Sequence, residues 1–139
     1  LKKDIPNIKF EVVGEIYNFD KLFLSINKDV KCWGKQKNLD KFIKGSFCGL
    51  ANLEIATGIQ GKILSYMSYG LPVICSKKTA SNFDNNVISY KDDKDLIDKI
   101  RKLKDDKKFS NYISKKSLKH VNKYIWKKVS KEYIKIINN

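Results

Sequence analysis

The chain has 139 residues, 42% of them hydrophobic, and carries 29 Lys and Arg against 15 Asp and Glu, a formal net charge of +14. This length supports one domain with a real core, and the apolar content excludes an intrinsically disordered chain. No apolar run approaches the roughly 18–20 residues that cross a bilayer, which argues against a membrane-spanning helix.

Taken in chain order, short strand patterns alternate with helical patterns. The predicted strands cover residues 9–14, 30–33, 46–51, 72–75 and 87–90. The predicted helices cover residues 20–27, a short turn around 42–43 capped by Asn38 or Asp40, 60–69 stopped by Gly70, 93–104, 107–118 and 121–137.

This alternation predicts an α/β fold: an open parallel sheet with helices on both faces and a helical C-terminus. In such sheets ligands bind beyond the carboxyl ends of the strands. The loops of interest are therefore those after Gly14, after Gly34 and over residues 54–61. Fold-level reasoning of this kind does not name a function.

The positive charge is concentrated near the C-terminus, where residues 107–139 hold ten Lys and one Glu, a net charge of +9. A segment of this kind attracts polyanions such as nucleic acid, an anionic membrane or phosphorylated substrates. A solvated helix face in a chain that uses Lys in place of Arg explains the pattern equally well.

The cysteines and the single histidine predict no metal site. Cys32, Cys48 and Cys75 lie in or beside predicted strands without C-x-x-C spacing, which favours buried free thiols in a reducing cytoplasm. His120 has no ligand residue at metal-binding spacing, so a structural or solvated histidine is expected.

The last helix carries apolar residues at helical spacing, which predicts that this face belongs to the core. The residues concerned are Val121, Ile125, Val129, Tyr133 and Ile136 or Ile137. Tyr124 and Trp126 among the lysines leave a second possibility open, a non-catalytic basic α/β module that binds nucleic acid.

The loop before the helix over residues 60–69 carries the chemistry. Small residues at a helix start leave backbone N–H groups free, and the helix dipole favours an anion there. Lys62 adds a positive charge. A Walker loop is excluded by the spacing of Gly58 and Gly61 and by Ile63 after the lysine, and no G-x-G-x-x-G occurs. Taken alone, the loop is more typical of an ordinary strand–helix turn than of a phosphate-binding loop.

A longer signature extends from this loop through the next strand. The frame consists of Gly58-Ile59-Gln60-Gly61-Lys62, Leu64, Ser65, Met67, Gly70 and Pro72-Val73-Ile74. It resembles the donor-site signature of retaining glycosyltransferases with the GT-B fold, the group of many lipopolysaccharide, O-antigen and capsule transferases. Supporting matches over the rest of the chain are Pro6, Phe10, Val12, Val13, Gly14, Gly34 and Trp126.

The resemblance implies a nucleoside-diphosphate sugar whose diphosphate rests on amides of the glycine loop and whose base lies near Gly34. The implied donor-binding residues are Gly34, Lys35, Thr57, Gly58, Ile59, Gln60, Gly61, Lys62 and Ser65. It also implies catalysis without a metal or other cofactor. The pairs Asp92-Asp93 and Asp105-Asp106 are expected to be helix caps or solvated.

Two departures from the family pattern bear on activity. The family commonly has a pair of Glu residues, the second binding ribose hydroxyls, but the matching positions hold Thr57 and Ser65, with Glu54 a candidate for the first. The chain also begins at Leu1 in what would be the end of a helix. We therefore expect a single donor-binding domain over residues 1–139, truncated at its N-terminus, without the acceptor-binding lobe and inactive alone.

The resemblance implies a cytoplasmic enzyme of cell-surface polysaccharide synthesis. The donor would be a UDP-sugar and the acceptor a lipid-linked glycan at the inner membrane face, with the basic helices near anionic lipid. Besides the nucleic-acid module, a degenerate donor domain that serves as a scaffold remains a possibility, because Ser65 replaces the usual carboxylate.

Overall fold

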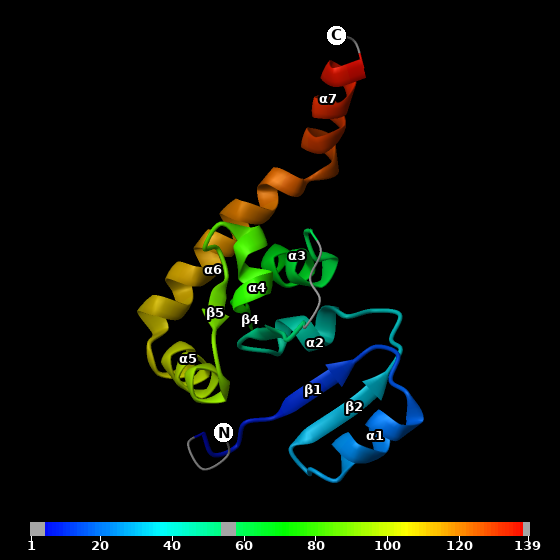
Figure 1. Cartoon of the computed structure of the whole chain (residues 1–139), viewed down its shortest axis with the longest axis vertical. Coiled ribbons are helices and arrows are strands. Elements are labelled where there is room, and N and C mark those ends of the chain that lie inside the picture. Colours follow the sequence, from blue (N-terminus) through cyan, green and yellow to red (C-terminus); the bar gives the residue numbers. More distant parts are fainter. Residues whose placement is uncertain (1–4, 54–57, 138–139) are drawn as a thin grey trace. The chain divides into compact units, whose positions relative to one another are not determined.

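The computed structural model describes residues 5–53 and 58–137, and the chain divides into two compact units, Leu1–Gly45 and Ser46–Asn139. Each unit has its own parallel strands (Figure 1). Parallel strands flanked by helices, followed by a helical C-terminus, confirm the predicted fold class. Among the described residues, every helix is too short or too polar to cross a bilayer.

The first unit is a strand–helix–strand segment followed by a short helix. Its elements are β1 (Phe10–Val13), α1 (Asn18–Ser25), β2 (Val30–Gly34) and α2 (Asp40–Lys44). β1 and β2 pair in parallel, with an irregularity between Val12 and Val13. The prediction that Asn38 or Asp40 caps α2 is wrong, because the N-cap position is Leu39, which makes no side-chain capping bond. Asn38 instead forms an Asx turn before the helix: its Oδ1 accepts a hydrogen bond from the backbone N–H of Asp40 at 2.7 Å.

The second unit contains a three-stranded parallel sheet in the order β3-β4-β5. The strands are β3 (Gly49–Ala51), β4 (Val73–Ser76) and β5 (Ile88–Tyr90). The helices are α3 (Gly61–Ser68), α4 (Lys77–Ala80), the 3-10 turn η1 (Ser81–Phe83), α5 (Asp93–Asp105), α6 (Lys107–Val121), the 3-10 turn η2 (Asn122–Tyr124) and α7 (Trp126–Ile137). The sequence pattern did not predict α4 and η1.

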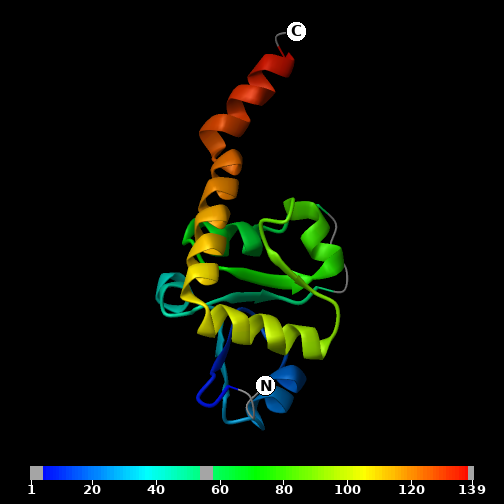
Figure 2. The ribbon, with the colours of Figure 1, turned by 90° about the vertical axis from the view of Figure 1, so that its left-hand side faces the viewer.

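Helices cover both faces of the central strand β4. Val73 and Cys75 pack with Ile63 and Met67 of α3, whereas Ile74, which points to the other face because side chains alternate along a strand, is also fully buried. α5 contacts β4 and β5, and Figure 2 shows α3 and α5 on opposite sides of the sheet. The sheet is therefore held rigidly from both sides.

The ends of α3, α5 and α6 follow the chemistry of their terminal residues. Gly70, with φ +68°, ends α3: its amide bonds to the Met67 carbonyl, and the Leu71 amide bonds to the Tyr66 carbonyl, which is the Schellman arrangement. Asp92 caps α5 and Asp106 caps α6, each accepting a backbone N–H at 2.8 Å. The prediction of Asp caps is confirmed for these two residues.

The prediction of a core face on the last helix is wrong. The helical segment breaks at η2, and beyond it Tyr133 is 62% exposed, Ile136 72% and Ile137 78%. Ile125 is also exposed, whereas Val121 and Val129 are half-buried. The reason is physical: apolar spacing makes a helix amphipathic, but burial also needs a surface to receive it, and no described element covers these side chains.

Candidate functional site

The start of α3 lies at the carboxyl edge of the second unit's sheet. β3 ends at Ala51, and the chain then reaches the first turn of α3 at Gly61. In parallel α/β sheets this edge is where ligands bind. The structure therefore brings Gly58, Ile59, Gln60, Gly61 and Lys62 together at the expected place, whereas Thr57 and Glu54 lie outside the described residues.

Two backbone donors at this helix start have no acceptor within the described part of the chain. The Gln60 carbonyl accepts hydrogen bonds from Ile63 and Leu64, but no acceptor is found for the amides of Gly61 and Lys62. Gln60, at the N-cap position, makes no capping side-chain bond, and no acidic residue lies in the first turn. The positive end of the helix dipole is therefore not neutralised by this helix's own residues.

The glycines beside these amides leave space for a ligand. Gly58 has φ +66°, a conformation that side chains disfavour, and a Cβ placed on Gly58 or on Gly61 would meet no atom within 4 Å. The Gly58 carbonyl accepts a hydrogen bond from the side-chain amide nitrogen, Nδ2, of Asn82 at 3.1 Å. Asn82 thus ties η1 to the loop, a role that sequence reasoning missed because η1 itself gave no signal.

The side chains around the loop are exposed. Lys62 is exposed in the first turn of α3, and Ile59 is exposed before it. Ser65, one turn further along, is exposed as well; its carbonyl accepts a bond from the Ser68 hydroxyl at 2.7 Å. These positions suit contact with a ligand better than packing in a core.

Polar side chains at the ends of β4 and β5 bind the residues that follow β3, and no local sequence pattern predicts these bonds. The Ser76 hydroxyl donates to the Leu53 carbonyl at 3.2 Å and lies 3.0 Å from the Thr79 hydroxyl. The Tyr90 hydroxyl donates to Asn52 Oδ1 at 2.6 Å. Burial raises the pKa of Tyr90, and the negative charges of Cys75 and Asp93, when ionised, add to that rise, so Tyr90 keeps the proton that it donates.

Gly34 and Lys35, the residues expected near the base, belong to the first unit. Gly34 ends β2 with φ +66°. Lys35 lines an open hollow of about 500 Å³ together with residues 36–38, 40 and 41, all of them polar. Gln36 Nε2 donates to the Trp33 carbonyl at 2.8 Å and so shapes the start of this loop. The side-chain amide and ammonium groups that line this hollow can donate hydrogen bonds to the carbonyl oxygens of a base.

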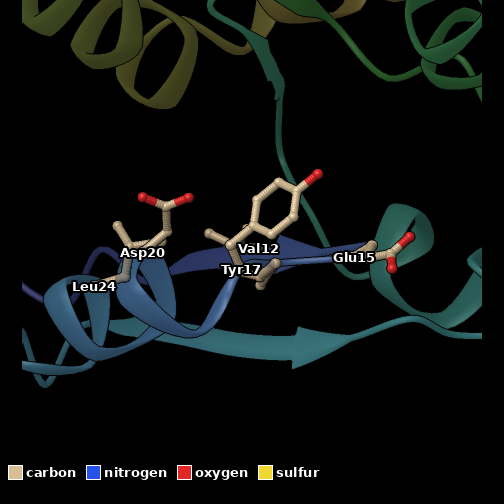
Figure 3. Close-up of a pocket in the computed structure, with 6 residues that line it drawn as sticks. Val12, Glu15, Tyr17, Asp20 and Leu24 are labelled. Atoms are coloured by element: carbon tan, nitrogen blue, oxygen red, sulfur yellow. The ribbon is translucent and has the colours of Figure 1, made fainter.

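A second hollow in the first unit has the opposite charge. It measures about 340 Å³ and is lined by Val12, Glu15, Ile16, Tyr17, Asp20 and Leu24. Figure 3 shows the side chains of Tyr17 and Asp20 pointing to the same side of β1. Two carboxylates in one hollow repel an anion, so this hollow does not suit a diphosphate.

Comparison with known proteins decides the family. A family model described as group 1 glycosyl transferases matches residues 1–106, about three quarters of the chain. The chain belongs to the group 1 glycosyltransferase family. No curated protein matches.

This glycosyltransferase chain is also similar to a solved structure described as the crystal structure of the GtfA/B complex. The TM-score is 0.77 at 15% sequence identity, with 99% of this chain covered. The likeness supports the GT-B type of fold. The chain spans only 30% of the length of that relative.

Two thiols of this glycosyltransferase chain, Cys48 and Cys75, are not suited to nucleophilic chemistry. All three cysteines are free; burial raises the pKa of Cys48 to about 12 and that of Cys75 to about 11. Both therefore stay protonated at neutral pH. Among the described residues, no group of three His, Cys, Asp or Glu side chains gathers in a way that could hold a metal ion.

Proposed function

We propose that this chain is the donor-binding part of a retaining glycosyltransferase that uses a nucleoside-diphosphate sugar, with UDP as the carrier. The observation that carries the proposal is the start of α3, where the backbone amides of Gly61 and Lys62 have no acceptor among residues 5–53 and 58–137, beside the open space at Gly58 and Gly61. A diphosphate needs such donors, and a helix N-terminus supplies them together with a favourable dipole.

In this proposal each site residue has a defined role. The amides of Gly61 and Lys62 bind the diphosphate, and the Lys62 ammonium adds charge. Gly34 and Lys35 receive the base in the first unit, while Thr57, Ile59 and Gln60 complete the loop. When the bond between the sugar and the diphosphate breaks, negative charge grows on the leaving phosphate, and the same donors stabilise it without a metal ion.

Ser65 stands where the related signature has a ribose-binding carboxylate. Its hydroxyl can hydrogen-bond a ribose hydroxyl, but a neutral group binds more weakly than a carboxylate, by about 1 kcal/mol. We therefore expect low donor affinity for the 139 residues alone. The degenerate-scaffold alternative predicts no donor binding at all.

The proposal extends to the acceptor and to the location of the enzyme. We infer a lipid-linked or polysaccharide acceptor in cell-surface glycan synthesis of the lipopolysaccharide, O-antigen or capsule kind, at the cytoplasmic face of the membrane. The lysine-rich segment over residues 107–139 supports an anionic surface as a partner. The acceptor would be bound by a further lobe, so these 139 residues alone should not transfer sugar.

Replacing Gly61 by proline tests the role of its amide directly. Gly61 is the first helical residue, where proline is well tolerated, and Gln60 before it has φ −90° and ψ 117°, as a residue before proline requires. Gly61→Pro therefore deletes one N–H group while keeping the helix. The matched control is Gly61→Ala, which keeps the N–H and adds a Cβ in open space.

We expect Gly61→Pro to weaken UDP binding about tenfold or more, since a hydrogen bond to a charged group contributes about 1.5–3 kcal/mol. Gly61→Ala should bind UDP within about twofold of the unchanged chain. Equal affinity of the proline and alanine variants, measured by calorimetry, would contradict the proposal. Salt-sensitive RNA binding with no response to UDP would favour the nucleic-acid module instead.

A further inference from the structure

His120, the single histidine of the chain, is buried at the end of α6 in the second unit. Its exposed fraction is 2%, and its ring contacts the rings of Phe83 in η1 and Tyr124 in η2. The ring nitrogen Nδ1 lies 2.9 Å from the side-chain nitrogen Nδ2 of Asn86. Because histidine gains a charge between pH 5 and 8, a change at this ring can act on the turn that contains Asn86.

The side chain of Asn86 fixes which nitrogen of the His120 ring carries the proton. Its Nδ2 also donates to the carbonyls of Phe83 at 2.9 Å and of Asp84 at 3.1 Å. The reversed amide would turn its oxygen toward these two carbonyls, so Nδ2 faces the ring and Nδ1 accepts. The ring proton therefore sits on Nε2, which is buried without a hydrogen-bond partner among residues 5–53 and 58–137. A second proton, on Nδ1, would point at the hydrogens of Nδ2 and break this bond.

The turn that Asn86 closes depends on such bonds. Asp84, with φ 47°, and Asn85, with φ 58°, are both in the left-handed conformation, which costs energy for residues that have a side chain. Lys116 of α6 also holds the turn, because its ammonium donates to the Asn85 carbonyl at 3.2 Å. Losing the bond between Asn86 and the ring therefore loosens a turn that is held against the preference of its backbone.

The same turn is connected to the glycine loop through η1. Asn82 of η1 directly precedes the buried Phe83, and its Nδ2 donates to the Gly58 carbonyl at 3.1 Å. The peptide bond after Gly58 is trans, so a bond that holds the carbonyl also sets the direction of the Ile59 N–H. A glycine has weak conformational preferences of its own, so the position of Asn82 matters for the shape of the loop.

We propose that Asn82 is a positioning residue of the donor loop and that protonation of His120 controls it through the turn over residues 83–86. With a neutral ring the turn is closed, and Asn82 holds the Gly58 carbonyl. A proton on Nδ1 releases the turn and weakens that hold, so the donor binds more weakly as the ring becomes charged. For its ligand the inference rests on the proposed function, whereas the link between His120 and the loop does not.

The groups around His120 set the direction of the change with pH. Burial lowers the pKa of His120 from 6.5, and Lys123 of η2 lowers it further, whereas Asp84 of the turn opposes them. The phenol ring of Tyr124 also faces the imidazole, and Lys116 lies one turn earlier on α6. The ring is therefore neutral at pH 7.5 and takes up its proton as the pH falls below 6.5.

Chemical shifts of the 139-residue chain, measured without a donor between pH 8 and 5, test the link. The Gly58 carbonyl carbon and the Ile59 amide nitrogen should shift with the same midpoint as the His120 ring. In Asn82→Ala the ring should still titrate, but the loop should no longer follow it. In His120→Gln the loop should stay constant, since the glutamine oxygen accepts the same bond at every pH. Unchanged amide shifts over residues 96–103 of α5 report that the fold is kept.

Calorimetric titration with UDP tests the effect on the donor site. From pH 7.5 to 5.0 the unchanged chain should lose about threefold more affinity than His120→Gln. The terminal phosphate of UDP takes up its own proton near about pH 6, but this affects both proteins alike. By linkage, saturating UDP should lower the midpoint of the His120 ring by about half a pH unit, which a merely structural histidine would not show.

A matched pair of variants in η1 separates Asn82 from its neighbour. At pH 7.5 Asn82→Ala should weaken UDP binding about threefold or more, because the loop loses its restraint. Ser81→Ala removes a hydroxyl that donates to the Lys78 carbonyl at 2.8 Å and does not reach the loop, so it should bind UDP within about twofold of the unchanged chain.

Four results would overturn the inference. The first is a His120 ring that does not titrate above pH 5, and the second is a Gly58 carbonyl carbon that keeps its shift while the ring titrates. The third is a loop that follows the ring in Asn82→Ala as it does in the unchanged chain. The fourth is the same loss of UDP affinity with pH in His120→Gln. Absence of UDP binding at every pH would instead contradict the proposed function, and the link, measured without a donor, would stand.

Discussion

Helices α3 and α7 belong to the same unit and carry the same kind of sequence pattern, but their apolar faces have opposite surroundings. In α3, Ile63 and Met67 are completely buried against the sheet. In α7, Trp126 and Ile137 are mostly exposed. Helical spacing therefore identifies an amphipathic helix, whereas a neighbouring surface decides whether its apolar face becomes core or interface.

Strand β3 packs closely against α3. Gly49 of β3 lies beneath the Tyr66 ring, so close that a Cβ on Gly49 would be 2.5 Å from the ring carbon Cδ2. Burial also raises the pKa of Tyr66. This close packing fixes the position of the first turn of α3, and with it the positions of the backbone amides of the candidate site.

Truncating a core residue gives the largest expected effect. Met67→Ala should lower the free energy of unfolding by about 2–5 kcal/mol, because it opens a cavity in a fully buried cluster. Ile137→Ala in α7 should change it by less than about 0.5 kcal/mol. Urea denaturation of both variants measures this difference; equal destabilisation would show that α7 packs as tightly as α3 and would break the comparison.

The fit between β3 and α3 can be tested next. Gly49→Ala forces Tyr66 to move and should cost about 1–3 kcal/mol of stability. Gly61→Ala makes the same chemical change where a Cβ meets nothing, and should be neutral or slightly stabilising. Thermal unfolding followed by circular dichroism compares them. If the two glycines tolerated alanine equally, the close contact at Tyr66 would be refuted.

The effect of a carboxylate on the exposed side of α3 is expected to be smaller. Ser65→Glu restores the acidic group of the related signature and should tighten UDP binding by about 1 kcal/mol, roughly fivefold. Ser68→Glu, at an exposed position almost one turn further along, controls for added charge. Calorimetric titration with UDP checks the pair; weaker binding by Ser65→Glu would remove Ser65 from the ribose site.

The smallest expected effect lies at the end of α6, just before α7. His120 is 2% exposed, packs against Phe83 and Tyr124, and its Nδ1 lies 2.9 Å from the Asn86 amide nitrogen, so the expectation of a structural histidine agrees with the geometry. Its pKa is lowered from 6.5, first by burial and then by Lys123, with Asp84 partly opposing.

This shift has a definite sign. The unfolded chain takes up the proton more readily than the folded one, so the stabilising contribution of neutral His120 is complete above pH 6.5 and falls as the pH drops through 6.5 toward the lower folded pKa. His120→Gln should flatten this part of the stability curve. Urea midpoints between pH 8 and 5.5 provide the test, and the same slope in both proteins would rule out a buried neutral His120.

Much of the fold could be predicted from the sequence because strands and helices of this chain end at residues with strong local preferences. Gly70 ends α3, and Asp92 and Asp106 cap the helices that follow them. The glycine loop could be predicted for a similar reason, since Gly58 has the left-handed backbone conformation (φ +66°) that glycine adopts without strain.

The rest depends on contacts between distant residues. Asn82 reaches the Gly58 carbonyl across 24 positions, and Tyr90 reaches Asn52 across 38, so no local pattern announces either bond. The exposure of α7 was missed for a related reason, because its apolar spacing is the same as that of a core helix. Whether Lys35 and Gly61 serve one ligand stays a prediction.

The most direct test of the central claim is a backbone chemical-shift titration of the 139-residue chain with UDP. We predict saturable shifts of the amides of residues 58–65, the largest at Gly61 and Lys62, with uridine producing much smaller ones there and residues 126–137 of α7 unaffected throughout. Shifts spread evenly over the lysine-rich helices, with none at Gly61 and Lys62, would contradict the account.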